Sequence, residues 1–263
     1  SKMPLPKLDD LFTTEEERTN AQLEKVVDIK ISDIDDFPNH PFKVIDDDEM
    51  EKMKNSIIDN KVIIPALVRP KPDGRYEMIS GHRRKRASEL ANKETLPCVV
   101  RELTDDEAII IMVDSNIQRE KLLPSEKAFA YKMKLDAIKH QGKSTFRQSV
   151  GKLESSYVLG EEVGESGRTI QRYIRLTYLI PELLDMVDKE RIAMGPAISL
   201  SYLNEDFQNA LLDYIQYFDA TPSQGQANEL KKLFQNNELE IQKIKEIMMK
   251  EKPNQVEKIK LDA

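Results

Sequence analysis

The residues with the strongest chemical character are four consecutive basic side chains that follow a glycine and a histidine. They occur in the stretch Met78-Ile79-Ser80-Gly81-His82-Arg83-Arg84-Lys85-Arg86-Ala87. The residues before Gly81 alternate like a β-strand, and those from Arg84 to Ala91 have helix-forming composition. Such a turn brings together free N–H groups, the positive end of a helix dipole and guanidinium groups. The pattern predicts an anion-binding site, and a solvated basic helix is the alternative.

A second group of chemically informative residues lies between positions 156 and 176. One helix is expected to end at Gly164, and a second begins after a tight turn, which is the layout of a helix-turn-helix. Apolar residues at helical spacing are expected to face inward in the second helix. Arginine and glutamine on the outer face suit base and phosphate contacts in DNA, although an ordinary helical hairpin with a basic face is the alternative. The candidate DNA-binding residues are Ser166, Arg168, Thr169, Gln171, Arg172 and Arg175.

The acidic net charge of the chain argues against a nucleic-acid-binding protein, but the distribution of the charges along the chain permits one. The chain has 263 residues, is 39% apolar and 33% charged, and carries a formal net charge of −7. Residues 1–60 hold 8 Lys/Arg against 16 Asp/Glu, whereas residues 132–175 hold 9 against 5. Phosphate affinity depends on the local field within about 8–10 Å. A DNA-binding middle segment is therefore compatible with the acidic total.

Hydropathy and cysteine content indicate a soluble protein of a reducing compartment. No apolar run approaches the length of a membrane span, and no signal-peptide pattern stands at the beginning. The single cysteine, Cys98, lies in an apolar, strand-like run and is expected to be a core residue rather than a nucleophile.

The elements that position both groups divide the chain into five parts. We expect a strand over Val27–Ile34, and a helix from about Glu49 to Asn60 capped by the preceding aspartates, with a metal site as the alternative use of those acids. Ser125 is expected to cap a helix that ends near Gly142. The predicted parts are a flexible acidic arm (1–27), an α+β domain (28–103), linking helices (104–142), a helix-turn-helix domain (143–205) and carboxy-terminal helices that could dimerise (206–263).

Three separate sequence motifs, called boxes here, resemble motifs of the ParB-type partition proteins. Residues Gly81 to Ala87 look like that family's arginine box, and Ser115 to Glu120 followed by Leu123 to Ala128 resemble its next box. Phe37 to Val44 resembles the first, proline-containing box. The resemblance implies an α+β amino-terminal ParB/sulfiredoxin-like domain, followed by an all-α helix-turn-helix domain and carboxy-terminal helices.

The same resemblance implies a ligand and the residues that would hold it. ParB amino-terminal domains bind CTP with Mg²⁺, and binding closes a dimeric clamp around DNA. By likeness, Gly81, His82, Arg83 and Arg84 would surround the triphosphate, and Asn116 would reach the metal and the phosphates with Glu120 close by. The residues expected against the base are Ile64, Pro65 and Ala66.

Two departures from the family pattern bear on hydrolysis. The family commonly has a glutamate where this chain has His82, and an acid where it has Ser115. Losing both carboxylates removes metal partners and groups that orient water. Binding of CTP is thus expected, whereas CTPase activity, at most weak, is left open; His82 could donate to phosphate or be a packed ring.

The resulting expectation is a sequence-specific DNA-binding protein, gated by CTP, for plasmid or chromosome partition or for the maintenance of a mobile element. A helix-turn-helix transcriptional regulator without a nucleotide switch is the alternative. Sulfiredoxin chemistry would need a reactive cysteine in the box, and a nuclease would need clustered carboxylates or histidines, so neither is expected. The implied partners are a palindromic DNA site, a second copy of the chain and a Walker-type ATPase, in the cytoplasm on a nucleoid or plasmid.

Overall fold

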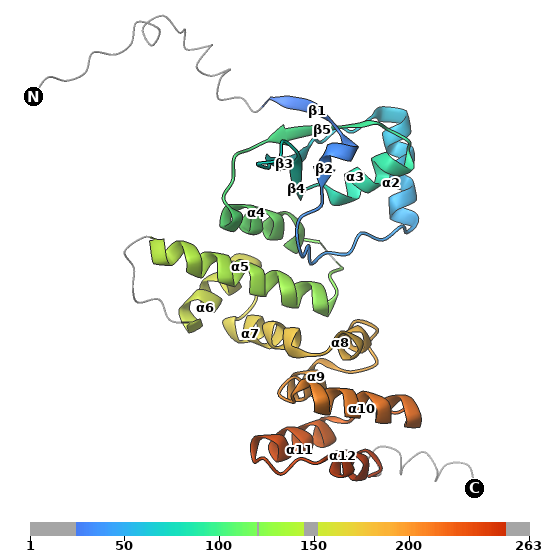
Figure 1. Cartoon of the computed structure of the whole chain (residues 1–263), viewed down its shortest axis with the longest axis vertical. Helices are drawn as coiled ribbons and strands as arrows, with labels where there is room; N and C mark the ends of the chain where they lie inside the picture. Colours follow the sequence, from blue (N-terminus) through green and yellow to red (C-terminus); the bar gives the residue numbers. More distant parts are fainter. Residues whose placement is uncertain (1–24, 120, 145–151, 251–263) are drawn as a thin grey trace, which may run out of the picture. The chain divides into compact units, whose positions relative to one another are not determined.

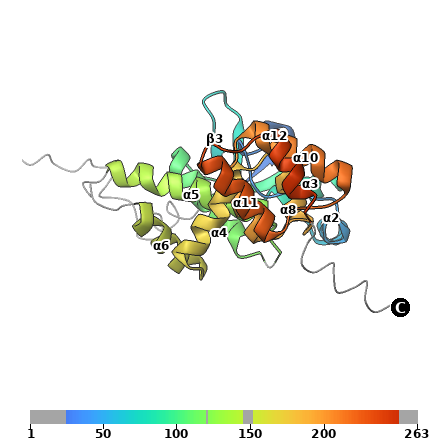
Figure 2. The same ribbon diagram turned by 90° about the horizontal axis from the view of Figure 1, so that it is seen from below.

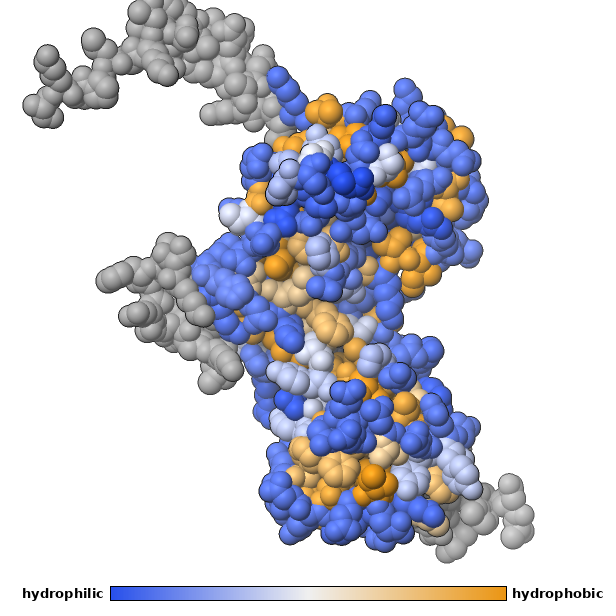
Figure 3. All heavy atoms as spheres, viewed as in Figure 1, coloured by the Kyte–Doolittle hydropathy of each residue, from blue (hydrophilic) through white to orange (hydrophobic). Residues whose placement is uncertain are grey.

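The computed structural model describes residues 25–119, 121–144 and 152–250. The chain forms two compact units, Ser1–Met112 and Val113–Ala263. Within the described ranges, no helix combines the length and apolar character needed to cross a membrane. Hydrophilic side chains cover most of the face seen in the space-filling view, with separate apolar patches among them (Figure 3). The mixed α/β first unit and the helical remainder confirm the expected fold class.

A five-stranded mixed sheet forms the centre of the first unit (Figure 1). Its strand order is β1-β5-β3-β4-β2; β1 and β5 are antiparallel, as are β3 and β4, whereas β3–β5 and β2–β4 are parallel. The buried side chains of these strands include Ala66, Met78 and Cys98. The strands are β1 (Val26–Lys30), β2 (Ile34–Asp35), β3 (Ala66–Pro70), β4 (Tyr76–Ser80) and β5 (Thr95–Val100).

The expected continuous strand over Val27–Ile34 was wrong. A 3₁₀ turn at Ile31–Asp33 separates β1 from β2. The first strand pairs with β5, whereas Ile34 and Asp35 pair with β4. Because the chain changes its pairing partner within four residues, one regular strand cannot cover the segment, and alternation of residue types does not reveal such a change.

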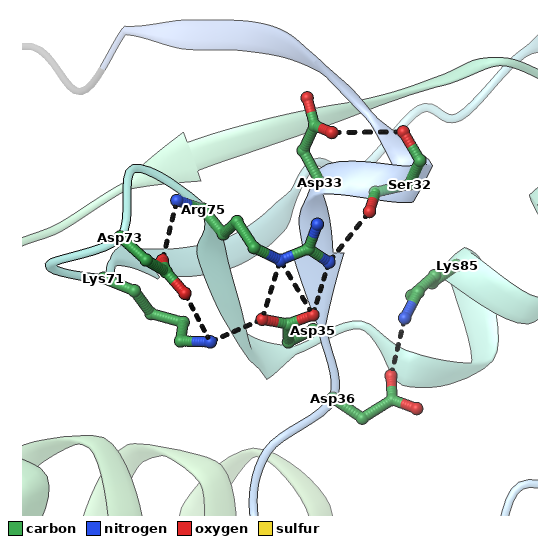
Figure 4. Close-up of polar contacts among 8 residues, drawn as sticks. All are labelled: Ser32, Asp33, Asp35, Asp36, Lys71, Asp73, Arg75 and Lys85. Atoms are coloured by element: carbon green, nitrogen blue, oxygen red, sulfur yellow. Dashed lines mark hydrogen bonds and ion pairs between the residues drawn. The ribbon is translucent and has the colours of Figure 1, made fainter.

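The β3–β4 hairpin is tied to β2 by a charged cluster (Figure 4). The carboxylate of Asp35 accepts hydrogen bonds from Arg75 Nε at 3.1 Å and from Lys71 Nζ at 2.5 Å. Arg75 Nη2 also donates to the carbonyl oxygen of Ser32 at 2.9 Å. The hydrogen bonds from Arg75 and then Lys71 hold the pKa of Asp35 well below its usual range. The turn that precedes β4 is therefore anchored by a carboxylate that stays ionised in acid.

Two helices of the first unit, α2 (Asp48–Asn60) and α3 (His82–Leu90), pack on each other through Met50, Ile57 and Ala87. Asp47 Oδ1 accepts a hydrogen bond from Met50 N at 2.9 Å, which confirms the predicted aspartate cap. The next helix, α4, spans Asp105–Ile117.

The second unit is helical (Figures 1 and 2). Most of its helices contribute side chains to one apolar core. Helices α10 and α12 contact each other, as do α9 and α11. The helices are α5 (Pro124–Ser144), α6 (Lys152–Val163), α7 (Gly167–Arg175), η3 (Leu176–Tyr178), α8 (Pro181–Asp188), α9 (Met194–Leu200), α10 (Glu205–Phe218), α11 (Gln224–Gln235) and α12 (Ile241–Met248).

Two predictions about α5 were wrong. The helix begins at Pro124, so Ser125 lies inside it, where its N and Oγ donate to Asp188 at 2.9 and 2.5 Å. The cap is thus supplied by α8, a long-range contact that local sequence does not reveal. The helix also continues through Gly142 to Ser144, because one glycine costs only about 1 kcal/mol in a long helix.

Candidate functional site

The turn at Gly81 joins β4 directly to α3. Gly81 has φ of 118°, a conformation that side chains with a Cβ rarely adopt. A Cβ placed there would lie 2.8 Å from Cβ of Ala66, which is fully buried in β3. Both the backbone conformation and the close packing therefore require glycine at the position where β4 ends and α3 begins.

The substitution Gly81→Ala is expected to lower the free energy of unfolding by about 1–3 kcal/mol, from backbone strain plus the contact with Ala66. Urea denaturation followed by circular dichroism measures the change. Gly74→Ala is the matched control, since Gly74 has φ of 82° but no atom within 4 Å of its added Cβ. A loss at Gly81 no larger than at Gly74 would contradict a packing requirement.

Three of the four consecutive basic side chains are paired with carboxylates of the loop at residues 36–47. The pairs are Arg83 Nη2 with Asp47 Oδ1 at 3.3 Å, Lys85 Nζ with Asp36 Oδ1 at 2.7 Å, and Arg86 Nη2 with Asp46 Oδ2 at 2.6 Å. The pair at Lys85 is drawn in Figure 4. These carboxylates partly neutralise the basic helix, which sequence reasoning did not anticipate.

The fourth basic side chain, Arg84, turns toward backbone carbonyls instead. Its Nη1 donates to the carbonyl oxygens of Ile64 at 2.7 Å and Pro65 at 2.6 Å. Burial lowers the pKa of Arg84. The side chain of Ile64 is 68% exposed, whereas Ala66 lies beneath Gly81. The structure therefore places residues 64–66 next to the arginine box. Residues that bind one ligand must lie close together in this way.

His82 is a packed ring. Its side chain is 7% exposed and stacks on His40, with ring centroids 3.7 Å apart and an interplanar angle of 29°. The rings of His40 and Phe42 make an edge-to-face contact, with centroids 5.6 Å apart and an interplanar angle of 67°. This contact between the proline-containing box and the arginine box was not predicted, because it joins residues far apart in the chain. It corresponds to the packed-ring alternative considered for His82.

Asn116 belongs to the second unit and lies near the end of α4. Its side chain is 4% exposed, and Nδ2 donates to Ser115 Oγ at 3.2 Å. Glu120 lies outside the described residues. Among those residues, no three histidine, cysteine, aspartate or glutamate side chains gather as a metal-ligand cluster. A magnesium ion would thus depend on the phosphates of a nucleotide for most of its ligands.

Cys98 has no features of a reactive thiol. It is fully buried in β5, and its Sγ donates to the carbonyl oxygen of Leu96 at 3.3 Å. Burial raises the pKa of the Cys98 thiol to about 12. At neutral pH the thiol is protonated, so it is a poor nucleophile.

Helices α6 and α7 form the expected helix-turn-helix layout. Gly164, with φ of 72°, ends α6, and Glu165 N donates to the carbonyl oxygen of Gly160 at 2.8 Å. A Cβ on Gly160 would clash with the carbonyl oxygen of Glu165, so this glycine lets the turn close on α6. Sequence reasoning did not single out Gly160. Ser166 Oγ accepts from Thr169 N at 3.0 Å and caps α7.

The outer face of α7 is only partly as expected. Ile170 is fully buried, whereas Arg168 and Arg172 are exposed and Gln171 is half-buried. Arg175 was expected to point outward, but its Nε and Nη2 donate to Ser201 Oγ at 3.0 Å and to the Ser201 carbonyl oxygen at 2.5 Å. These long-range contacts fold its guanidinium back onto the second unit.

Helix α5 holds the helix-turn-helix in place. Lys134, on α5, is buried and bonds Asp114 of α4 at 2.5 Å and Glu162 of α6 at 2.6 Å. Burial alone would lower the pKa of Lys134, but the hydrogen bonds to the two acids outweigh burial and raise it. Lys127 pairs with Glu165 in the turn at 2.9 Å. These ion pairs hold α5 against α6 and against the turn that leads to α7.

Comparison with known proteins agrees with this organisation. Residues 15–117 match the model of the ParB N-terminal domain. The chain is 31% identical over 181 residues to the chromosome-partitioning protein Spo0J of Thermus thermophilus, which covers 69% of this chain and 61% of that protein. It is 34% identical over 168 residues to a probable chromosome-partitioning protein ParB of Pseudomonas putida, covering 64% and 53%. The chain therefore spans less than two thirds of these relatives' lengths.

A solved pNOB8-like ParB N-domain is similar in fold, with a TM-score of 0.50 over 91% of this chain and 97% of that one. The sequence identity of that match is 15%, so it concerns the fold alone. The residues that match the family model include those of the sheet, the turn at Gly81 and the arginine box. Residues 15–117 therefore belong to the ParB N-terminal domain family, in a chain that resembles ParB-type chromosome-partitioning proteins.

Proposed function

We propose that this chain is a DNA-binding partition protein that binds CTP at the arginine box and DNA through α7. In this proposal the nucleotide gates a clamp formed by two copies of the chain on a palindromic site, on a plasmid or chromosome in the cytoplasm. A Walker-type ATPase is the partner that the family resemblance implies.

The proposal that the chain binds a nucleotide rests on one observation: the glycine turn, two arginines and residues 64–66 lie together at the first turn of α3. The turn at Gly81 opens a helix N-terminus, Arg83 lies in that first turn, and Arg84 reaches the segment 64–66. Helix N-terminal N–H groups and guanidinium groups are preferred ligands of phosphate. The exposed Ile64 beside them offers an apolar surface for a base.

The DNA proposal rests on α7. Arg168 and Arg172 are exposed one turn apart, and Gln171 lies between them. Arginine pairs with guanine and glutamine with adenine in the major groove, where the second helix of such a motif binds. The choice of CTP over other nucleotides, and the roles of Asn116 and Mg²⁺ in binding it, are proposed from the family resemblance alone. Because His82 is a packed ring, the proposal is for binding rather than hydrolysis.

The proposal is tested by titrating the chain with CTP, ATP and GTP in the presence of Mg²⁺, using isothermal calorimetry. We expect heat of binding with CTP and at least tenfold weaker binding of the other two. If none of the three nucleotides binds, with or without DNA, the proposal that a nucleotide controls DNA binding is contradicted.

Replacing Asp47 by asparagine is expected to raise CTP affinity by about twofold to fivefold. An exposed ion pair contributes about 0–1 kcal/mol to stability. Binding of a phosphate to Arg83 must break the pair with Asp47, so this free energy is subtracted from the binding free energy of CTP. Asparagine still caps α2, so the fold is retained. Calorimetry with CTP measures the change, and Asp46→Asn, which frees Arg86 instead, is the control. If both substitutions change the affinity for CTP equally, Asp47 and the phosphates of CTP do not compete for Arg83.

A helix-turn-helix regulator without a nucleotide switch is the second candidate, and the three ion pairs on α3 favour it. They give the basic helix a structural use without any ligand. The double substitution Arg83→Ala, Arg84→Ala separates the two. Unchanged loading of this variant onto closed circular DNA would support the regulator.

A further inference from the structure

Three cations and two tyrosines alternate across the second unit. Lys132 Nζ lies 5.6 Å from the ring centre of Tyr178, and the Arg175 guanidinium lies 4.4 Å from Tyr178 and 4.0 Å from Tyr202. Lys231 Nζ lies 3.7 Å from the ring of Tyr202. These distances are within the range of cation–π attraction. We call these five residues the cation–tyrosine ladder; they come from α5, α7, η3, the α9–α10 connection and α11.

The ladder has positive charge without carboxylate partners. None of the ion pairs among the described residues involves Lys132, Arg175 or Lys231. The basic helix α3 differs, because acids of one loop accompany three of its four cations. Arg175 is hydrogen-bonded to Ser201, which is neutral, so the charges of all three cations remain uncompensated by these ion pairs. Three such cations produce a local positive field, which favours an external polyanion.

The ladder is continuous with the outer face of α7. Arg168, Arg172 and Arg175 are spaced i, i+4 and i+7, so they lie on one stripe of that helix. Arg168 and Arg172 point to solvent, and Arg175 is the member that enters the ladder. A partner lying along this stripe would therefore pass from the exposed arginines to the ladder.

The residues of the ladder suit phosphates better than base edges. Tyr178 is 56% exposed, and its ring, between Lys132 and Arg175, can offer a phenolic O–H donor beside them. Lysine, arginine and tyrosine side chains supply many phosphate contacts in protein–DNA complexes. Stacking on the rings also restricts the long cationic side chains, which lowers the entropy lost on binding.

A hollow of about 520 Å³ lies beside Arg175, Tyr178 and Tyr202. Glu205 lines this hollow too, and its carboxylate disfavours an anion inside it. The two lysines are not among the lining residues. The anion contacts are therefore expected at the ends of the ladder rather than in the hollow.

We propose that the cation–tyrosine ladder binds the phosphodiester backbone of duplex DNA and extends the interface of α7 beyond the helix-turn-helix. This inference rests on the proposed DNA binding by α7 and adds a second, sequence-independent surface. The ladder contributes affinity on all DNA sequences alike, whereas α7 contributes the choice of sequence.

The test is fluorescence anisotropy of the full chain with a random-sequence duplex and with a selected high-affinity duplex, at about 50 to 200 mM salt. The variants are Lys132→Gln and Lys231→Gln, with Lys232→Gln as the control from an exposed neighbour on α11. Each ladder variant is expected to weaken binding to both duplexes equally, by up to about eightfold, and to lower the salt slope by about one. Lys231→Arg is expected to keep the wild-type values.

The results that overturn the inference are distinct from those that overturn the proposed function. If the wild type binds and the ladder variants match Lys232→Gln, the ladder is not a DNA surface and α7 stands alone. A ladder variant that weakens binding to only one of the two duplexes also contradicts a backbone contact. If the wild type binds neither duplex, the DNA-binding function itself fails, and the ladder proposal fails with it.

Discussion

Replacing Arg83 by alanine is expected to weaken CTP binding by about tenfold or more. Arg83 lies in the first turn of α3, and a guanidinium–phosphate hydrogen bond contributes about 1.5–3 kcal/mol, where about 1.4 kcal/mol is a factor of ten. Among the described residues Arg83 Nη2 pairs with Asp47 at 3.3 Å, a distance at the weak end for an ion pair, so a phosphate can replace the carboxylate. Calorimetric titration with CTP and Mg²⁺ measures the loss.

Arg86→Ala is the matched control for that result. Arg86 follows three residues later on α3, is 41% exposed and pairs with Asp46 and Glu89. We expect its removal to change CTP affinity by less than about twofold, as for most isolated surface ion pairs. Equal losses for the two variants would mean that the helix attracts CTP through its general charge and not through a site at its first turn.

The second large effect is expected on DNA. Arg172→Ala should cost about 1–3 kcal/mol in affinity for the selected duplex, because Arg172 is exposed on the outer face of α7, the face that we propose contacts the bases. The loss should be smaller on random duplex, so the ratio between the two affinities should fall. Fluorescence anisotropy with both duplexes measures this ratio.

Arg191→Ala is the control for Arg172, since Arg191 is an exposed arginine of the same unit that pairs with Asp219 at 3.0 Å. Its replacement should leave both affinities unchanged. If Arg172→Ala weakens binding equally on both duplexes, Arg172 contacts phosphate, and the reading of bases must be assigned to Arg168 or Gln171.

The parts of the site that sequence predicted are those with a local physical cause. The glycine at 81 and the cap at Asp47 each follow from the backbone preferences of neighbouring residues. The helix-turn-helix follows from Gly164 and the apolar spacing around Ile170. Placement of segment 64–66 beside the arginine box came from the family resemblance, and the carbonyls that accept from Arg84 agree with it.

The parts that sequence did not predict depend on contacts between distant positions. The stacking of His40 on His82 and the pairing of Asp47 with Arg83 join residues 42 and 36 positions apart. Arg175 has the spacing of an outward residue, yet Ser201, Tyr178 and Tyr202 draw its guanidinium inward. The spacing of residues within one helix cannot predict such a contact, because the tertiary fold brings the contacting residue from another part of the chain.

A clamp gated by CTP would be trapped on a DNA circle without ends, so retention on closed circular DNA tests the proposed gating most directly. The chain is loaded with CTP and Mg²⁺ onto closed circular DNA that carries a selected site, and is then washed with high salt. We predict retention on the closed circle, loss of retention after the circle is cut, and no retention without CTP. Equal retention with and without CTP, or on cut and closed DNA alike, would contradict the clamp.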